Sequence, residues 1–168
     1  VADCSLCGLG QTAANPVLWI RDYGRDVAIQ ADNEMTMFFR TAAFDQDYSQ
    51  AALARYRAFL RERYGTIARL NRAHRVRLDA FEDLVPPRRF DAGEARTLPR
   101  YLDWIAFKEH ALQHAVSRVR DLFRHHGLGR VPVTHNLPLG HTRSPIDVQG
   151  LERVVDLAGM DLYYRKGD

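Results

Sequence analysis

The sequence predicts an α/β protein with a parallel β-sheet, and three observations support that prediction. Three short apolar runs, at residues 27–31, 130–136 and 159–164, have the composition of buried strands. Stretches with helical spacing of apolar residues lie between the first and second runs and again between the second and third. Such alternation is typical of parallel sheets, in which a helix connects each strand to the next.

The first connection begins with a helix that we expect over Gln50–Tyr64. Ser49 is a suitable N-cap, two arginines occupy the last turn, and Gly65 follows as a stop. A second short helix, Thr66–His74, is expected directly after it. The first of these helices carries Leu53, Tyr56, Leu60 and Tyr64 on one face.

Residues 75–97 are expected to form an irregular excursion, because they contain Pro86-Pro87, a glycine and mixed charge. The longest helix then runs from about Thr97 to His126, and a short helix near Val148–Leu157 precedes the third strand. The apolar stripe expected on the longest helix consists of Leu102, Ile105, Leu112, Val116, Val119 and Phe123.

Polar side chains stand at the ends of all three predicted strands. In parallel α/β architectures the loops after the strands converge over one face, and functional residues gather there. A single polar strand end is often only a turn or cap, whereas three together favour a site. The residues concerned are Asn33 and Glu34, then Thr134 and Asn136, then Tyr163 and Tyr164.

Glu34 is the strongest candidate for chemistry among them. The strongly apolar stretch MTMFF (35–39) follows it, which argues against a simply exposed loop carboxylate. A carboxyl group held against apolar surface has a raised pKa, which suits a general acid. The residues alone therefore indicate a candidate acid beside an amide donor at the mouth of a parallel sheet.

The stretch VAIQADNE (27–34) resembles the acid/base strand of retaining β-glycosidases built on the (β/α)8 barrel, in which an Asn-Glu pair closes the fourth strand. Three further stretches resemble the family 42 β-galactosidases and their family 35 relatives. They are DYSQAALARYRAFLRERYGTIARLN (47–71), the Pro-Pro pair with YLDWIAFK (101–108), and VPVTHN (131–136). The resemblance covers most of the chain from about Gly24 onward.

This resemblance implies a role for each candidate residue. Glu34 matches the general acid/base, and Asn33 matches the amide that hydrogen-bonds the sugar 2-hydroxyl. Asn136 and Tyr163 or Tyr164 would line the sugar pocket. Neighbours in a strand point to opposite faces, so the strand must break or bulge if Asn33 and Glu34 serve one sugar.

The resemblance also implies a partial (β/α)8 TIM barrel, about strands four to six with their helices, as one segment over residues 1–168. A retaining mechanism needs a nucleophilic carboxylate about 5–5.5 Å from the acid/base. In these families that carboxylate closes the seventh strand, whereas this sequence stops after the sixth. We therefore expect part of a longer β-galactosidase-like hydrolase, inactive by itself, with a β-galactoside or similar carbohydrate as substrate and no cofactor.

A non-catalytic α/β module is the alternative from a different class. In that case the chain would be a sugar-binding or degenerate remnant, and Asn33 and Glu34 would be structural. Such a module must fold stably by itself, and an isolated three-stranded parallel sheet would leave unpaired edges. The strand edges therefore favour part of a larger barrel.

Metal sites are a third possibility, and we expect none. His110 and His114 share a helical spacing with Glu109 adjacent, but the H-E-x-x-H order of zinc proteases is absent. Cys4 and Cys7 form a C-x-x-C pair without a second pair to complete a zinc site, so buried thiols are the preferred interpretation.

Composition excludes two classes of partner. The chain has 24 Lys plus Arg against 21 Asp plus Glu, and the two signs alternate along helices, which does not indicate a nucleic-acid-binding face. No apolar run approaches the ~20 residues of a membrane helix. No secretion signal is visible, so we expect a cytoplasmic protein, and a homo-oligomer stays open.

Overall fold

The computed structural model describes residues 28–32, 44–45, 47–137 and 146–160. These residues fall into two compact units. The sheet unit contains the strands, and the helical unit contains helices α2 and α3. Helix α4 (Pro99–Phe123) belongs to the helical unit up to His114 and to the sheet unit from Ala115 onward.

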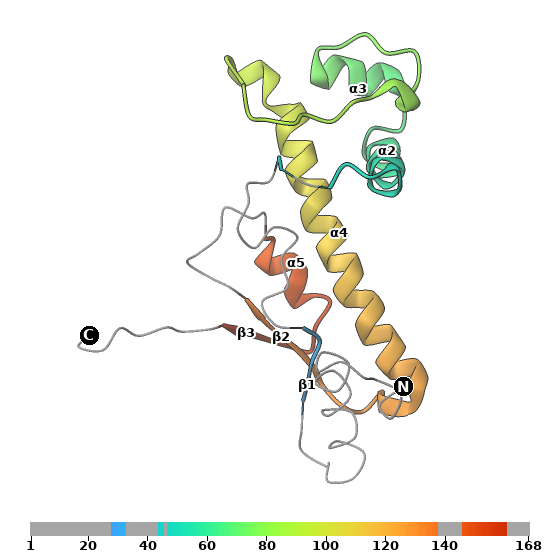
Figure 1. Ribbon diagram of the computed structural model, residues 1–168, viewed down its shortest axis with the longest axis vertical. Coiled ribbons are helices and arrows are strands. Elements are labelled where there is room, and N and C mark those ends of the chain that lie inside the picture. Colours follow the sequence, from blue (N-terminus) through green and yellow to red (C-terminus); the bar gives the residue numbers. More distant parts are fainter. Residues whose placement is uncertain (1–27, 33–43, 46, 138–145, 161–168) are drawn as a thin grey trace, which may run out of the picture. The chain divides into compact units, whose positions relative to one another are not determined.

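The sheet unit is built on three parallel strands, as the sequence predicts (Figure 1). The strands are β1 (Ile29–Gln30), β2 (Val133–Leu137) and β3 (Leu157–Met160), in the spatial order β1-β2-β3. Ile29 pairs with Val133, and Leu157 pairs with Thr134. Because all strands run in one direction, their carboxyl ends lie at the same edge of the sheet.

The predicted bounds around the third strand need correction. The helix expected over Val148–Leu157 is α5, which ends at Glu152, and β3 begins at Leu157 rather than at Gly159. Asp156 explains the early start, because its backbone N–H donates to the carbonyl of Val133 over 2.8 Å. Its carboxylate in turn accepts from the backbone N–H of Val133 over 2.9 Å. The predicted strand residues beyond 160 lie outside the described part of the chain.

The two faces of the sheet differ in burial. Ile29, Val133 and His135 are buried, with exposed fractions of 2%, 1% and 1%. On the opposite face Asn136 is half-buried and Gln30 is exposed. This alternation is the normal period of two in a β-strand, and it gives the sheet one buried face and one more polar face.

Helix α2 (Gln50–Tyr64) has the bounds that the sequence predicts. The Ser49 hydroxyl accepts from the backbone N–H of the third helical residue over 3.2 Å, and Gly65 ends the helix with a φ of +71°. Helix α3 (Ile67–His74) begins one residue later than expected, because Thr66 is its N-cap.

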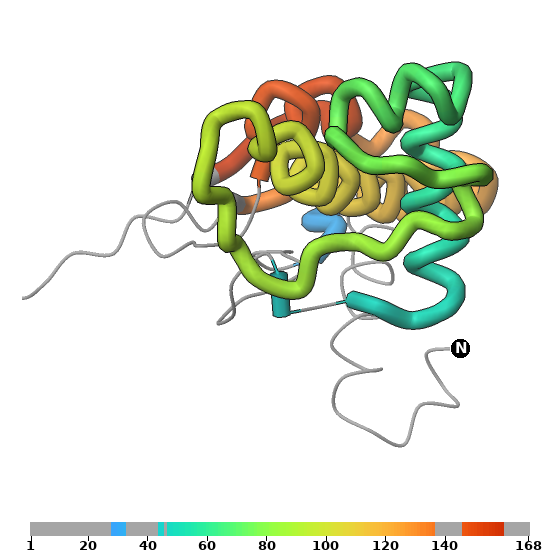
Figure 2. The backbone as a smooth tube through the Cα atoms, turned by 90° about the horizontal axis from the view of Figure 1, so that it is seen from above, coloured from blue at the N-terminus to red at the C-terminus, as the bar shows by residue number. Residues whose placement is uncertain are grey.

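The expected excursion after α3 is confirmed as irregular. Figure 2 shows it as one long open loop from the end of α3 to the start of α4. It holds two short 3₁₀ turns, η2 (Phe81–Asp83) and η3 (Ala95–Thr97). At its start Arg75 has a φ of +59°, a left-handed conformation that ends α3.

The core of the helical unit is aromatic. The apolar stripe predicted on α4 is therefore wrong in part. Leu102 is 56% exposed, whereas Tyr101 and Trp104 are fully buried. The large rings remove more apolar area from water than one leucine does, so they take the inward face. Leu112 and Val116 of the predicted stripe are buried as expected. The core cluster consists of Tyr56, Leu60, Leu70, Phe81, Leu84, Trp104 and Phe107.

The end of α4 is a single wide turn, η4 (Arg124–Leu128). Gly127 has a φ of +88° there, which suits glycine, so the regular helix ends slightly before the predicted His126.

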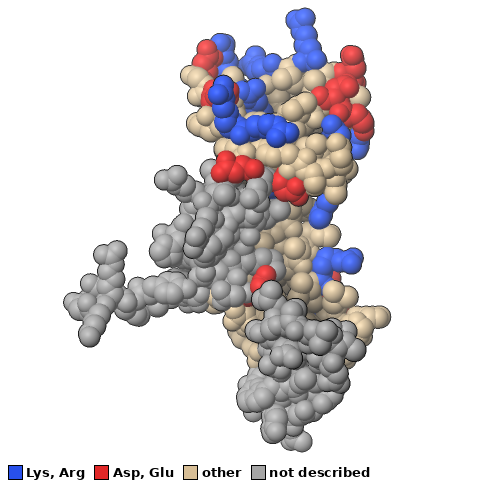
Figure 3. Space-filling view, in the orientation of Figure 1, with Lys and Arg blue, Asp and Glu red and all other residues tan. Residues whose placement is uncertain are grey.

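Charged side chains of both signs are interspersed on the face shown in Figure 3. Among the described residues several opposite charges form ion pairs, for example Arg61 with Glu82 and Arg124 with Asp156. Within the described ranges, no helix combines the length and the apolar character that crossing a membrane requires.

Candidate active site

The candidate site begins where β1 ends. Directly after β1, the backbone N–H of Ala31 donates to the carbonyl of Thr134 over 2.8 Å. The chain then bends at Asp32. Asn33 and Glu34 follow this bend in the sequence and lie outside the described residues. β1 (Ile29–Gln30) and the bend at Asp32 both precede the pair. The expected break or bulge that would let Asn33 and Glu34 serve one sugar stays a prediction.

Of the residues to which the resemblance gives a role in the site, Asn136 lies in the described part of the chain. It is the last residue but one of β2, at the edge where the carboxyl ends of the strands meet. Its partner in β3 is Gly159, which has no side chain to cover it. On the β1 side, the Nε2 atom of Gln30 donates to the Oδ1 atom of Asn136 over 2.8 Å.

Gln30 is a residue of this edge that sequence reasoning missed. Its Nε2 atom also donates to the backbone carbonyl of Asp32 over 3.0 Å, so it contacts the bend of β1 as well as the side chain of Asn136. The available signal was a single carboxamide within the apolar run of residues 27–31, directly after the buried Ile29.

The roles expected for the two tyrosines stay predictions. Tyr163 and Tyr164 follow the end of β3 by three and four residues in the sequence and lie outside the described part. Of the glutamates that the structure does describe, none stands at the carboxyl end of a strand.

The residues considered for a metal site lie on α4. His110 is exposed and its ring contacts Phe59 at 5.5 Å between centroids, while His114 is also exposed. Burial, with a contribution from Asp147, raises the pKa of Glu109. Within the described ranges, no three His, Cys, Asp or Glu side chains are grouped so that they could hold a metal ion.

A buried polar network joins the three helices of the helical unit. Asp103, 2% exposed, contacts the Nε2 atom of His74 at 2.6 Å and accepts from the Tyr64 hydroxyl over 2.7 Å. Burial, together with the bond to Asp103, raises the pKa of Tyr64 to about 12. Arg63 completes the set at 3.2 Å from the same carboxylate. Each group faces another member of the network, so its role is structural.

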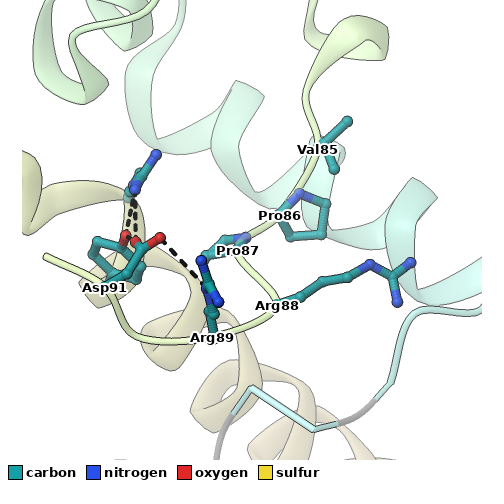
Figure 4. A pocket seen from close by; sticks show the side chains of 8 residues that line it. Val85, Pro86, Pro87, Arg88, Arg89 and Asp91 are labelled. Atoms are coloured by element: carbon teal, nitrogen blue, oxygen red, sulfur yellow. Dashed lines mark hydrogen bonds and ion pairs between the residues drawn. The ribbon is translucent and has the colours of Figure 1, made fainter.

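A hollow of about 340 Å³ lies along the proline-rich segment after η2 (Figure 4). Asp91 lies between two arginines, 3.0 Å from Arg100 and 3.7 Å from Arg89. Arg88 points away from Asp91 and stacks over the ring of Tyr48 at 4.4 Å. The cations of this hollow therefore have partners within the protein, and nothing in its chemistry selects a ligand.

Comparison with known proteins decides the family. The family model of glycoside hydrolase family 42, described as beta-galactosidase, matches residues 21–168. The chain belongs to glycoside hydrolase family 42. A beta-galactosidase of Bifidobacterium bifidum, BbgII, is 26% identical over 127 residues, which are 73% of this chain and 18% of that protein.

Two solved structures have the same fold as this family 42 chain. A beta-galactosidase from the haloarchaeon Halorubrum lacusprofundi superposes with a TM-score of 0.71 at 21% identity, over 91% of this chain and 22% of that one. A beta-galactosidase from the psychrophilic Marinomonas ef1 gives a TM-score of 0.68 at 23% identity, over 88% and 22%. The chain thus spans about a fifth of the length of the relatives that it matches.

Proposed function

We propose that this family 42 chain is part of a retaining β-galactoside hydrolase and that Glu34 is its general acid/base. The observation that carries the proposal is the edge of the sheet. There the chain bends at Asp32, which precedes Asn33 and Glu34 in the sequence, and Gln30 of β1 contacts the half-buried Asn136 of the next parallel strand. Membership of a glycoside hydrolase family supplies the reaction class.

We further propose that β1, β2 and β3 are strands four to six of a (β/α)8 barrel. Their parallel order β1-β2-β3 supports this assignment, as does the similarity to β-galactosidase chains over most of this sequence. Active sites of such barrels lie at the carboxyl ends of the strands, which is the edge that holds Asn136.

The chemistry of Glu34 has two steps. As an acid it protonates the glycosidic oxygen while a second carboxylate attacks the anomeric carbon, so the aglycone leaves as a neutral alcohol and a glycosyl-enzyme ester forms. As a base it then takes a proton from water, which attacks the same carbon and releases the sugar and the nucleophile. Glu34 ends the cycle protonated, ready for another substrate.

The amides and tyrosines at this edge bind the sugar in this proposal. Asn33 donates to the 2-hydroxyl, a contact that strengthens as positive charge develops at the anomeric centre. Asn136 and Tyr163 or Tyr164 line the pocket. The nucleophile comes from another part of the polypeptide. This proposal is supported by the finding that the chain spans only about a fifth of the length of its relatives.

The test is hydrolysis of aryl β-glycosides by the full-length protein and its Glu34→Gln variant. For a phenyl galactoside, whose leaving group needs a proton, we expect Glu34→Gln to lower kcat/KM by about 100- to 10,000-fold. For a dinitrophenyl galactoside the loss in kcat/KM is much smaller, because that phenolate leaves without protonation. The basic limb of the pH profile, which reports the acid in the free enzyme, also disappears in the variant.

Glu62→Gln is the matched control, since Glu62 is an exposed residue of α2. We expect it to leave both substrates unaffected. Equal losses for both leaving groups in Glu34→Gln would contradict the acid/base role and would instead fit a nucleophile. Sugar binding without turnover by the wild type would favour the non-catalytic module, and a panel of galactoside, glucoside and arabinoside substrates identifies the sugar.

A further inference from the structure

We propose that Gln30 is a positioning residue of this site, which orients Asn136 toward the sugar and holds the bend that precedes Asn33. The inference rests on the proposed function, because it concerns the same edge of the sheet. Gln30 contacts two elements of that edge with one nitrogen atom, and these two contacts are the basis of the proposal.

The first contact fixes an amide. The Nε2 atom of Gln30 lies 2.8 Å from the Oδ1 atom of Asn136, across the gap between β1 and β2. An amide whose oxygen accepts from Gln30 has its NH2 group directed away from Gln30. A sugar hydroxyl on that side therefore meets a donor, and a flipped Asn136 would present an acceptor instead.

The second contact fixes the backbone. The same Nε2 atom lies 3.0 Å from the carbonyl oxygen of Asp32, where the chain bends. This carbonyl belongs to the peptide group that leads into Asn33. Since an NH2 group has two hydrogens, Gln30 can make both bonds at once and so couples the end of β1 to the end of β2.

A purely structural role explains these contacts less well. Gln30 is exposed, and an exposed hydrogen bond between amides competes with water and adds little to stability. Stability of this part of the sheet comes from the opposite face, where Ile29 and Val133 are buried. The contacts of Gln30 therefore affect the orientation of the Asn136 amide more than the stability of the fold.

The experiment is a double-mutant cycle in the full-length enzyme with an aryl β-galactoside as substrate. The variants are Gln30→Met, which keeps the length of the side chain without its donor, Asn136→Ala, and the two combined. We expect Gln30→Met to lower kcat/KM roughly tenfold, the size of one lost hydrogen bond of ordinary strength. In the Asn136→Ala background the same substitution should lower kcat/KM clearly less than in the wild type, because only the contact with the Asp32 carbonyl remains to be lost.

Two controls distinguish an effect on the orientation of Asn136 from an effect on protein stability. Gln50→Met makes the same substitution at an exposed position of α2 and should leave kcat/KM and Tm unchanged. Gln30→Glu keeps the shape but carries no NH2 group, so it should be impaired as Gln30→Met is. The Tm of both Gln30 variants should lie close to that of the wild type.

The outcomes distinguish this inference from the proposed function. Equal effects of Gln30→Met in both backgrounds, an unimpaired Gln30→Met, or a fully active Gln30→Glu would overturn the positioning role. If Glu34→Gln is impaired in the same assays, the proposed function survives that result. A wild type without turnover on any of the aryl glycosides, or an unimpaired Glu34→Gln, would overturn both.

Discussion

Replacing Lys108 with methionine should remove a pH dependence of stability that the structure predicts. Lys108 lies in α4 and is 0% exposed, with its Nζ atom 4.1 Å from the centroid of the Trp104 ring. A backbone carbonyl, that of Asp47, lies 3.4 Å from the same atom. Burial lowers the pKa of Lys108 from 10.5 to about 8, and the nearby Asp47 carboxylate opposes this shift only in part.

The sign and size of the effect follow from proton binding. Between pH 8 and 10.5 the unfolded chain holds a proton on this amine that the folded protein has released, so the free energy of unfolding rises with pH. The lowering of the pKa from 10.5 to about 8 corresponds to about 3 kcal/mol in total. Between about pH 7 and pH 9.5 the gain is about 2 kcal/mol.

Urea unfolding at these two pH values, followed by tryptophan fluorescence, measures the gain directly. Staying below about pH 10 avoids the tyrosines, whose ordinary pKa lies there. Methionine is similar in length to lysine and uncharged. The free energy of unfolding of Lys108→Met should therefore not show the rise with pH that Lys108 causes. At pH 7 it should exceed that of the wild type by up to about 3 kcal/mol. Arg57→Met, at a half-buried position of α2, is a control for the loss of a cation.

A direct titration gives the refuting result. Carbon-13 NMR of protein with labelled lysine follows the titration of Lys108, and the Lys108 signal is assigned by its absence in Lys108→Met. A pKa of Lys108 at or above 10 would refute the reasoning. So would a Lys108→Met variant that retains the full gain in stability between the two pH values.

Other substitutions test the helical unit by urea unfolding. Asp103→Asn should lower the free energy of unfolding by about 3 kcal/mol, because it weakens a buried network with His74 and Tyr64; a loss below about 1 kcal/mol would contradict that network. Ser49→Ala should lower it by about 1 kcal/mol through the lost N-cap of α2. Gly65→Ala should lower it by a similar ~1 kcal/mol, since its φ is +71°, and no change at either position would contradict the capping argument.

Local signals allowed parts of the fold to be predicted to the residue. The bounds of α2 depend on Ser49 and Gly65, which act within one turn of the helix ends. The predicted start of β3 was wrong because Asp156 is hydrogen-bonded to Val133, which lies 23 residues earlier in the sequence. A helix end carries its own sequence signature, whereas the start of a strand is set by the chain that pairs with it.

The burial of two charged residues could not be predicted either, because their partners are also distant in the sequence. Asp103 and Lys108 have the polar character of a solvated helix face, yet both are buried. Their partners, His74 and Asp47, are 29 and 61 residues distant in the sequence. Periodicity reports which residues are apolar, and it cannot report which polar group will meet another across the core.

In the proposed site, Asn136 was predicted from its position at a strand end, whereas Gln30 was overlooked because it lies inside an apolar run. The two lie 106 residues apart in the sequence and meet only because β1 and β2 are neighbours in the sheet. A residue whose function is to hold another residue has no signature of its own. Its role becomes visible when the pairing of the strands is known.

The polar face of the sheet gives a physical argument for where the site lies. Strands of a parallel sheet are usually apolar on both faces because helices cover both. Here Ile29, Val133 and His135 are buried, while Gln30 and Asn136 on the opposite face carry amides. A covering helix would have to satisfy those amides, whereas a solvated cavity with a sugar in it satisfies them directly. The polar character of this face thus supports the proposal that it lines the mouth of a barrel and that substrate binds there.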